Sequence, residues 1–353
     1  MHSKPEVPDR CDEAPFSAGH PGRLFLWFPV GLAHRKVRQY LRGIERSFTT
    51  TLSGALTVDA PEGFPEELVL DLTQLLTEHE SGDTRCVFKI GGDDLDVDDI
   101  ARVRTIDELR HARASSWFVD MLRAERLTSV FQPIVLASET SKVMGHEALM
   151  RGIDLDGKQM SAGSLLEAAR DCGMMGELDC AARRSAINIV ASQEERRPVF
   201  LNFTAEAMRD GVRGLSPTIR AIESADIPRE RVVFEVIEAE QMADVAQLKT
   251  VVDSVRAEGF RVSLDDIGVE DHSRRLIHAV RPDFVKLDMQ RVRRSPLPHL
   301  GDAERLLDLA QHLKIETIAE GVETVEELDW NRERGATYVQ GYYIARPGEL
   351  RVA

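Results

Sequence analysis

Cysteine is scarce in this sequence, and the four cysteines form no recognisable pair. Cys11, Cys86, Cys172 and Cys180 make no Cys-x-x-Cys motif, and no histidine lies beside them at the spacing of a zinc ligand. The sequence therefore argues against a disulfide framework and against a structural zinc site.

Long apolar runs are also absent. The longest, Leu24–Ala33, is about half as long as a membrane-spanning helix requires. The first residues are acidic and rich in proline, unlike the basic start of a signal peptide. We therefore predict a cytoplasmic protein that does not interact with the membrane.

The chain has no excess of basic residues. Its 45 Lys and Arg face 60 Asp and Glu, which gives a formal net charge of −15 at pH 7. Because neutralising phosphates needs a basic face, binding to duplex nucleic acid is excluded as the main function. Apolar residues, in contrast, are plentiful at 42% of the chain, enough for a sizeable core and against wholesale disorder.

The residue pattern divides the chain into four parts. Residues 1–21 contain four prolines and few apolar residues, which predicts a mobile tail. Residues 22–98 alternate strand-like and helix-like runs, which predicts a small α/β module. No motif in this module identifies a ligand or protein partner, so a regulatory or sensor role is a hypothesis. Residues 99–127 have the period of a helical linker, and residues 128–353 form the largest domain.

The domain over 128–353 alternates strand-like runs with amphipathic helices. Repeated strand–helix units predict an α/β fold, namely a (β/α)8 TIM-like barrel, and a doubly wound sheet is the competing solution. The predicted strands are Val130–Val135, Gly145–Leu149, Val199–Phe203, Val232–Val236, Arg261–Leu264, Phe284–Leu287, Glu316–Ala319 and Thr337–Val339.

Polar residues mark the ends of seven of these strands. They are Glu147, Asn202, Glu235, the pair Asp265–Asp266, Lys286, Glu320 and Gln340. One such residue alone is more often part of a solvated turn. In a (β/α)8 barrel, however, these ends open on one face, where active sites lie. The recurrence over seven strands therefore predicts a shared site.

Five carboxylates in one site require positive charge between them, because like charges repel strongly at short range. No cysteine or histidine converges with them, and oxygen ligands favour Mg²⁺ or Mn²⁺ over zinc. The adjacent Asp265 and Asp266 suit a two-metal site, and phosphoester hydrolysis is the typical reaction of such sites.

Eight short motifs follow one another along residues 128–350. They are Phe131-Gln132-Pro133-Ile134, Gly145-His146-Glu147-Ala148-Leu149-Met150-Arg151, Leu201-Asn202-Phe203-Thr204, Glu235-Val236-Ile237-Glu238, Leu264-Asp265-Asp266-Ile267-Gly268, Lys286-Leu287-Asp288, Ala319-Glu320-Gly321-Val322-Glu323 and Gln340-Gly341-Tyr342-Tyr343. In this order they resemble the EAL-domain cyclic-di-GMP phosphodiesterases, which are named after the Glu-Ala-Leu motif. The resemblance implies hydrolysis of cyclic di-GMP to linear pGpG with Mg²⁺ or Mn²⁺, inhibition by Ca²⁺, and a homodimer formed through the barrel.

The resemblance also implies roles for individual residues. Lys286 would orient the attacking water, and Gln340 would line the site beside it. Arg151 and Gln132 would contact the substrate, and Glu238 would hold the loop that follows the Asp pair. The metal ligands it implies are Glu147, Asn202, Glu235, Asp265, Asp266 and Glu320, of which Asp266 and Glu320 also count among the catalytic residues.

One loop departs from the family pattern. After Asp266 the family usually continues Phe-Gly-Thr-Gly-Tyr-Ser-Ser-Leu, whereas this chain has Ile267, Gly268, Val269, Glu270, Asp271, His272, Ser273 and Arg274. The change removes a hydroxyl group at Val269 and a flexible backbone position at Glu270. Two alternative hypotheses therefore remain besides an active enzyme: a cyclic-di-GMP receptor without turnover, and a protein-interaction scaffold.

Overall fold

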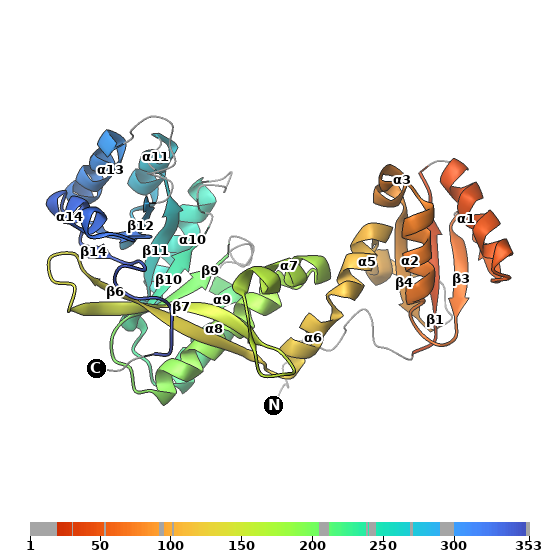
Figure 1. Cartoon of the computed structure of the whole chain (residues 1–353), viewed down its shortest axis with the longest axis horizontal. Coiled ribbons are helices and arrows are strands. Elements are labelled where there is room, and N and C mark those ends of the chain that lie inside the picture. Colours follow the sequence, from red (N-terminus) through yellow and green to blue (C-terminus); the bar gives the residue numbers. More distant parts are fainter. Residues whose placement is uncertain are drawn as a thin grey trace, which may run out of the picture. The chain divides into compact units, whose positions relative to one another are not determined.

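The computed structural model describes residues 20–29, 31–52, 54–91, 95–100, 102–204, 212–237, 239, 245–268, 271–289 and 300–350. These residues fall into two compact units (Figure 1). Unit 1 comprises Met1–Ala124 with Leu166–Met174, and unit 2 comprises Glu125–Leu165 with Met175–Ala353. Most of the tail predicted over 1–21 lies outside the described residues.

Unit 1 is built on a five-stranded antiparallel sheet with the strand order β2-β3-β1-β4-β5. Leu24, Leu26, Leu56 and Phe88 belong to a core that the sheet shares with its helices. The elements are β1 (Gly22–Trp27), α1 (Gly31–Gly43), β2 (Phe48–Thr50), β3 (Leu56–Ala60), α2 (Glu66–Leu75), α3 (Glu78–Asp83), β4 (Arg85–Ile90), α4 (Val97–Ile100), β5 (Arg104–Thr105), α5 (Ile106–Ala114) and α6 (Ser116–Arg123).

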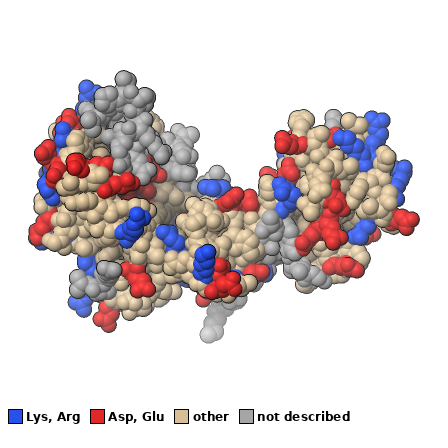
Figure 2. All heavy atoms as spheres, viewed as in Figure 1, with Lys and Arg blue, Asp and Glu red and all other residues tan. Residues whose placement is uncertain are grey.

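The segment Leu166–Met174 is held in unit 1 by hydrogen bonds. Arg104 donates to the carbonyl oxygens of Asp171 and Cys172 at 2.8 and 3.0 Å, and Ser115 donates to the Asp171 carboxylate at 3.0 Å. Carbonyls in the last turn of a helix lack partners within the helix, so these donors satisfy them. In the same unit, Lys and Arg side chains gather over α1 (Figure 2).

Unit 2 is a closed barrel of eight strands, as the sequence predicted. Its order is β6-β14-β13-β12-β11-β10-β9-β7, with β8 added beside β7, and the pairing of β6 with β7 closes the ring. The strands are β6 (Leu127–Leu136), β7 (Val143–Ile153), β8 (Gln159–Met160), β9 (Val199–Phe203), β10 (Val232–Val236), β11 (Arg261–Ile267), β12 (Phe284–Asp288), β13 (Glu316–Glu320) and β14 (Tyr338–Val339).

One strand distinguishes this barrel from a regular (β/α)8 barrel, because β6 runs antiparallel to both of its neighbours. Only residues 137–142 connect β6 to β7, a link too short for the helical crossover that parallel strands need. From β7 onward the barrel strands are parallel.

Helices connect the parallel strands, and those that belong to unit 2 lie around the outside of the barrel (Figure 1). They are α7 (Ala162–Cys172), α8 (Met175–Ser192), α9 (Val212–Ser224), the short 3-10 helix η3 (Arg229–Arg231), α10 (Val245–Ala257), α11 (Asp271–Val280), α13 (Leu300–Leu313) and α14 (Val325–Glu333). Among the described residues no helix is both long and apolar enough to span a membrane.

The inward-facing side chains of the barrel form layers. Ile134, Phe200, Val233, Phe284 and Ile318 pack together as one fully buried apolar layer. Because side chains alternate along a strand, the residues two positions further on point inward as well. Those residues are Asn202 after Phe200, Glu235 after Val233, Lys286 after Phe284 and Glu320 after Ile318.

Candidate functional site

Lys286 lies at the centre of a ring of carboxylates directly above the apolar layer. Its side chain is 1% exposed, and its ammonium nitrogen lies 2.5 Å from Glu235, 3.1 Å from Glu147 and 3.6 Å from Asp265. It also forms an ion pair with Glu320. The acids come from β7, β10, β11 and β13, so barrel closure brings them together.

The charges in this ring shift one another's protonation. Burial raises the pKa of Glu235 well above its usual range, and Glu147 and Asp265 add to the effect against the opposing Lys286. Burial likewise raises the pKa of Glu320. Burial alone would lower the pKa of Lys286, but the surrounding carboxylates outweigh it and raise the pKa. One ammonium therefore stays charged among more acid than it can neutralise.

Amide side chains fix the orientation of Glu147. Gln340 donates to Glu147 Oε2 at 2.7 Å and to Gln132 Oε1 at 3.3 Å, and Asn202 donates to Glu147 Oε1 at 3.5 Å. Gln132 in turn donates to the carbonyl oxygen of Ala345 at 3.0 Å. Because β6 runs antiparallel, Gln132 lies directly opposite Glu147 in the ladder between β6 and β7.

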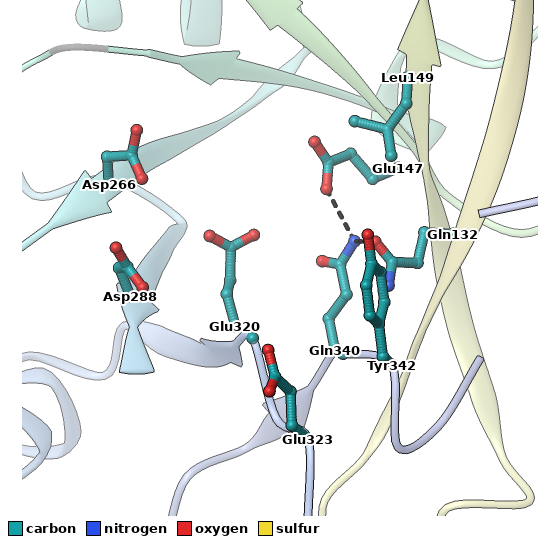
Figure 3. A pocket seen from close by; sticks show the side chains of 11 residues that line it. Gln132, Glu147, Leu149, Asp266, Asp288, Glu320, Glu323, Gln340 and Tyr342 are labelled. Atoms are coloured by element: carbon teal, nitrogen blue, oxygen red, sulfur yellow. Dashed lines mark hydrogen bonds between the residues drawn. The ribbon is translucent and has the colours of Figure 1, made fainter. Parts of the chain in front are cut away.

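A cavity of about 330 Å³ opens above the ring. Figure 3 shows Asp266 and Asp288 on one side of it, Glu147, Gln132 and Gln340 on the other, and Glu320 between them. Asp266 has a φ of 52°, and the pairing of β11 with β12 shifts register between Leu264 and Ile267. This bulge leaves Asp265 buried and Asp266 exposed, so both adjacent acids serve the same site.

The donor set fits a hard divalent cation. Glu235, Asp265 and Glu320 each bring one carboxylate oxygen within 4.8 Å of the others. Among the described residues, Glu235 Oε2 is buried without a hydrogen-bond partner, and Asp265 Oδ1 is buried with no hydrogen bond beside its 3.6 Å ion pair with Lys286. Buried carboxylate oxygens that accept no hydrogen bond are costly, and Mg²⁺ and Mn²⁺ prefer oxygen ligands of this kind.

One predicted site residue, Arg151, stands apart from the cavity, and another is not described. Arg151 follows Glu147 on β7 but does not line the cavity, and its guanidinium donates to the carbonyl oxygen of Met150 at 2.7 Å. Glu238 lies outside the described residues, as do Val269 and Glu270 of the altered loop. The structure brings together the remaining residues: Gln132, Glu147, Asn202, Glu235, Asp265, Asp266, Lys286, Glu320 and Gln340.

The cavity is also lined by residues for which the sequence predicts no role. Leu149, Asp288, Glu323 and Tyr342 line it. All four lie within the eight motifs of residues 128–350, so those motifs pointed to these positions. Their orientation toward the cavity depends on how the strands close, which a motif does not state.

Comparison with known proteins identifies this barrel. A family model described as the EAL domain matches residues 115–347. The chain belongs to the EAL domain family. The match covers the whole ring of carboxylates and the cavity above it.

Several curated proteins are related to this EAL domain. It is 28% identical over 229 residues to the probable cyclic di-GMP phosphodiesterase PdeG of Escherichia coli K12, covering 62% of this chain and 44% of the relative. It is 29% identical over 233 residues to the cyclic di-GMP phosphodiesterase NbdA of Pseudomonas aeruginosa, covering 64% and 29%. The matched region thus spans less than half the length of these relatives.

Solved EAL structures share the fold. The EAL domain of FimX from Xanthomonas citri, in complex with cyclic di-GMP, superposes with a TM-score of 0.62 at 19% identity, over 69% of this chain and 96% of that domain. A standalone EAL protein from Vibrio cholerae O395, in its cyclic-di-GMP-bound form, gives a TM-score of 0.52 at 29% identity, over 63% and 92%.

Proposed function

We propose that the EAL barrel hydrolyses one phosphodiester bond of cyclic di-GMP to give linear pGpG, with Mg²⁺ or Mn²⁺. The observation that carries the proposal is the ring of four carboxylates around Lys286 at the floor of the cavity. The relationship to named cyclic di-GMP phosphodiesterases supports the choice of substrate. So does the 29% identical Vibrio structure with this ligand bound.

The proposed metal ligands are Glu147, Asn202, Glu235, Asp265, Asp266 and Glu320. Bound divalent ions would lower the pKa of water and offset charge that develops on the phosphoryl oxygens. Gln340 holds Glu147 in one orientation through its 2.7 Å hydrogen bond. Pre-positioned ligands of this kind tune a metal site.

Lys286 and the cavity wall act on water and substrate in this proposal. The raised pKa of Lys286 keeps its ammonium charged, so it can donate hydrogen bonds to an attacking water or a phosphoryl oxygen. Gln132 and Arg151 are the proposed substrate contacts. Tyr342 is half exposed in the wall of the cavity and offers an aromatic face for a base.

The other parts of the chain keep the roles predicted from the sequence. We assign regulation to the module at 22–98, linkage to residues 99–127 and catalysis to residues 128–353. Dimerisation through the barrel and inhibition by Ca²⁺ belong to the same proposal. The loop change at Val269 and Glu270 supports one alternative, a receptor that binds cyclic di-GMP without turnover.

The test incubates the purified full chain with cyclic di-GMP and Mn²⁺ or Mg²⁺ and follows pGpG by chromatography. Glu147→Ala should abolish the product, whereas Glu139→Gln, an exposed acid outside the cavity, should leave it unchanged. Ligand binding measured in Ca²⁺ separates the alternatives. Binding without product supports the receptor, and neither binding nor product refutes both functions.

A further inference from the structure

A second cavity lies at the opposite end of the barrel strands from the carboxylate ring. It measures about 500 Å³ and is formed at the starts of β11, β12 and β13. Four basic side chains line it, Arg256, Arg261, Arg281 and Lys314, together with the acids Asp283 and Glu316. The buried apolar layer of Phe284 and Ile318 lies between this cavity and the acidic site.

The two acids of this cavity already have partners. Asp283 accepts hydrogen bonds from Arg256 Nη2 at 3.0 Å and from the backbone nitrogen of Val262 at 2.9 Å. Glu316 accepts a hydrogen bond from the Tyr338 hydroxyl at 2.9 Å. Asp283 thus neutralises Arg256, and Glu316 is the one acid of the cavity left to face the other three cations.

Those three cations make no ion pair with any described residue. Arg261 packs over the Phe284 ring at 5.2 Å, and its Nε is buried without a hydrogen-bond partner. Arg281 donates from Nε to the carbonyl oxygen of His278 at 3.4 Å, and no described residue accepts a hydrogen bond from its two Nη groups. The Lys314 ammonium likewise has no hydrogen-bond partner in the described part of the chain.

The backbone shows that these cations occupy unusual positions. Arg281 and Lys314 have φ angles of 53° and 59°, in the left-handed region where glycine is the least strained residue. They directly follow the ends of α11 and α13. A cation at the C-terminal end of a helix also interacts favourably with the helix dipole. Stabilisation of the helix ends is therefore the alternative explanation for the positive charge of Arg281 and Lys314.

We propose that this cavity binds the phosphate group of a small phosphorylated molecule. Three cations that pair with no described residue face one acid there, and two of them are guanidinium groups with paired donors that match phosphate oxygens. The buried and unpaired Nε of Arg261 adds a donor that a bound oxyanion can satisfy. The site is separate from the proposed catalytic function and does not depend on it.

The test is isothermal titration calorimetry on the full chain with inorganic phosphate, pyrophosphate and GTP in separate arms. EDTA is present, so that no divalent cation can hold an anion at the carboxylate ring. We expect saturable binding of at least one of the three. The arm that binds most tightly then identifies whether the phosphate group alone or the nucleotide is recognised.

The key variant is Arg281→Gly with Lys314→Gly. Glycine tolerates both left-handed positions, so the fold should be retained while two cations are removed. Losing a hydrogen bond to a charged group weakens binding about tenfold or more, so the double variant should bind about a hundredfold less tightly. The matched control, Arg35→Gln with Arg42→Gln on α1, removes two cations in unit 1 and should bind like the parent.

Two results would overturn the proposal. One is the absence of saturable binding of all three anions to the parent protein. The other is equal binding by the parent and the double glycine variant. If the parent binds no anion and the double glycine variant loses thermal stability, the two cations act only to stabilise the ends of α11 and α13.

Discussion

At the scale of one residue, the burial of the Glu235 carboxylate in the site lowers the stability of the folded protein. The Glu235 side chain is fully buried, and Lys286 at 2.5 Å is its only nearby cation in the described part of the chain. Burial of a carboxylate that is incompletely compensated destabilises the folded state, whereas an amide of the same shape carries no charge to desolvate.

We therefore expect Glu235→Gln to stabilise the metal-free protein. The folded-state pKa of Glu235 lies above its unfolded value of 4.5. The contribution of Glu235 to the free energy of unfolding is therefore favourable below pH 4.5 and is lost as the pH rises. The gain from the amide should grow above pH 4.5 and reach about 1–2 kcal/mol at pH 8. Urea denaturation in EDTA between pH 4.5 and 8 measures it. Glu139→Gln, at an exposed acid, is the control. A Glu235→Gln variant no more stable than the parent at pH 8 would contradict the prediction.

Lys286 should show the opposite behaviour. Lys286→Met leaves Glu147, Glu235, Asp265 and Glu320 without the ammonium that all four contact. Breaking a buried ion pair in this way costs about 3–5 kcal/mol. We expect that loss in urea denaturation with EDTA and a partial recovery in Mn²⁺. A variant as stable as the parent in EDTA would show that the acids are protonated or solvated instead.

At the scale of elements, the loops after β13 and β14 depend on a close backbone approach. A side-chain carbon at Gly341 would lie 2.0 Å from the carbonyl oxygen of Val322 and 2.3 Å from its nitrogen. Val322 and Gln340 are also joined by a backbone hydrogen bond of 3.1 Å. The glycine therefore allows the strand ends that carry Glu320 and Gln340 to meet.

Gly341→Ala should consequently separate these strand ends and destabilise the protein by about 2–3 kcal/mol. Phosphodiesterase activity should fall with it, because Glu320 and Gln340 move apart. The matched control is Gly176→Ala in α8, where an added carbon meets nothing within 4 Å and should stabilise the helix slightly. Thermal denaturation and pGpG release measure both variants, and equal stability of the two would refute the prediction.

At the scale of the whole molecule, the described residues of the two units share no hydrophobic core. One core contains Leu24, Leu56 and Cys86 in unit 1, and another surrounds the barrel in unit 2. Cores that share no residues can unfold separately. Cys86 reports on the first of them, because it is fully buried and burial raises the pKa of its thiol to about 12.

We expect calorimetry to resolve two unfolding transitions. In a variant with Cys11, Cys172 and Cys180 replaced by serine, Cys86 should resist a thiol reagent at pH 8, because the thiolate is the reactive form. Its labelling should rise about a hundredfold only as unit 1 unfolds. The urea-unfolded variant serves as the control for full reactivity. A native labelling rate equal to that control would contradict the burial of Cys86.

Much of the fold and the site follows from local periodicity. Alternating strands and helices predict the barrel, and the two-residue period of a strand places Asn202, Glu235, Lys286 and Glu320 on one face above an apolar layer. Because acids and no histidine or cysteine occur at the strand ends, the residue types alone indicate a hard metal ion. These features depend on neighbours within a few positions, so the sequence by itself determines them.

Tertiary structure decided what depends on closure and register. The short β6–β7 connection makes β6 antiparallel and sets Gln132 opposite Glu147, and the bulge in β11 divides the roles of Asp265 and Asp266. The encirclement of Lys286 and the inclusion of Asp288 and Tyr342 in the cavity arise from strands far apart in sequence. So does the basic cavity at the other end of the barrel. Such contacts depend on how eight strands close, and no local pattern encodes that geometry.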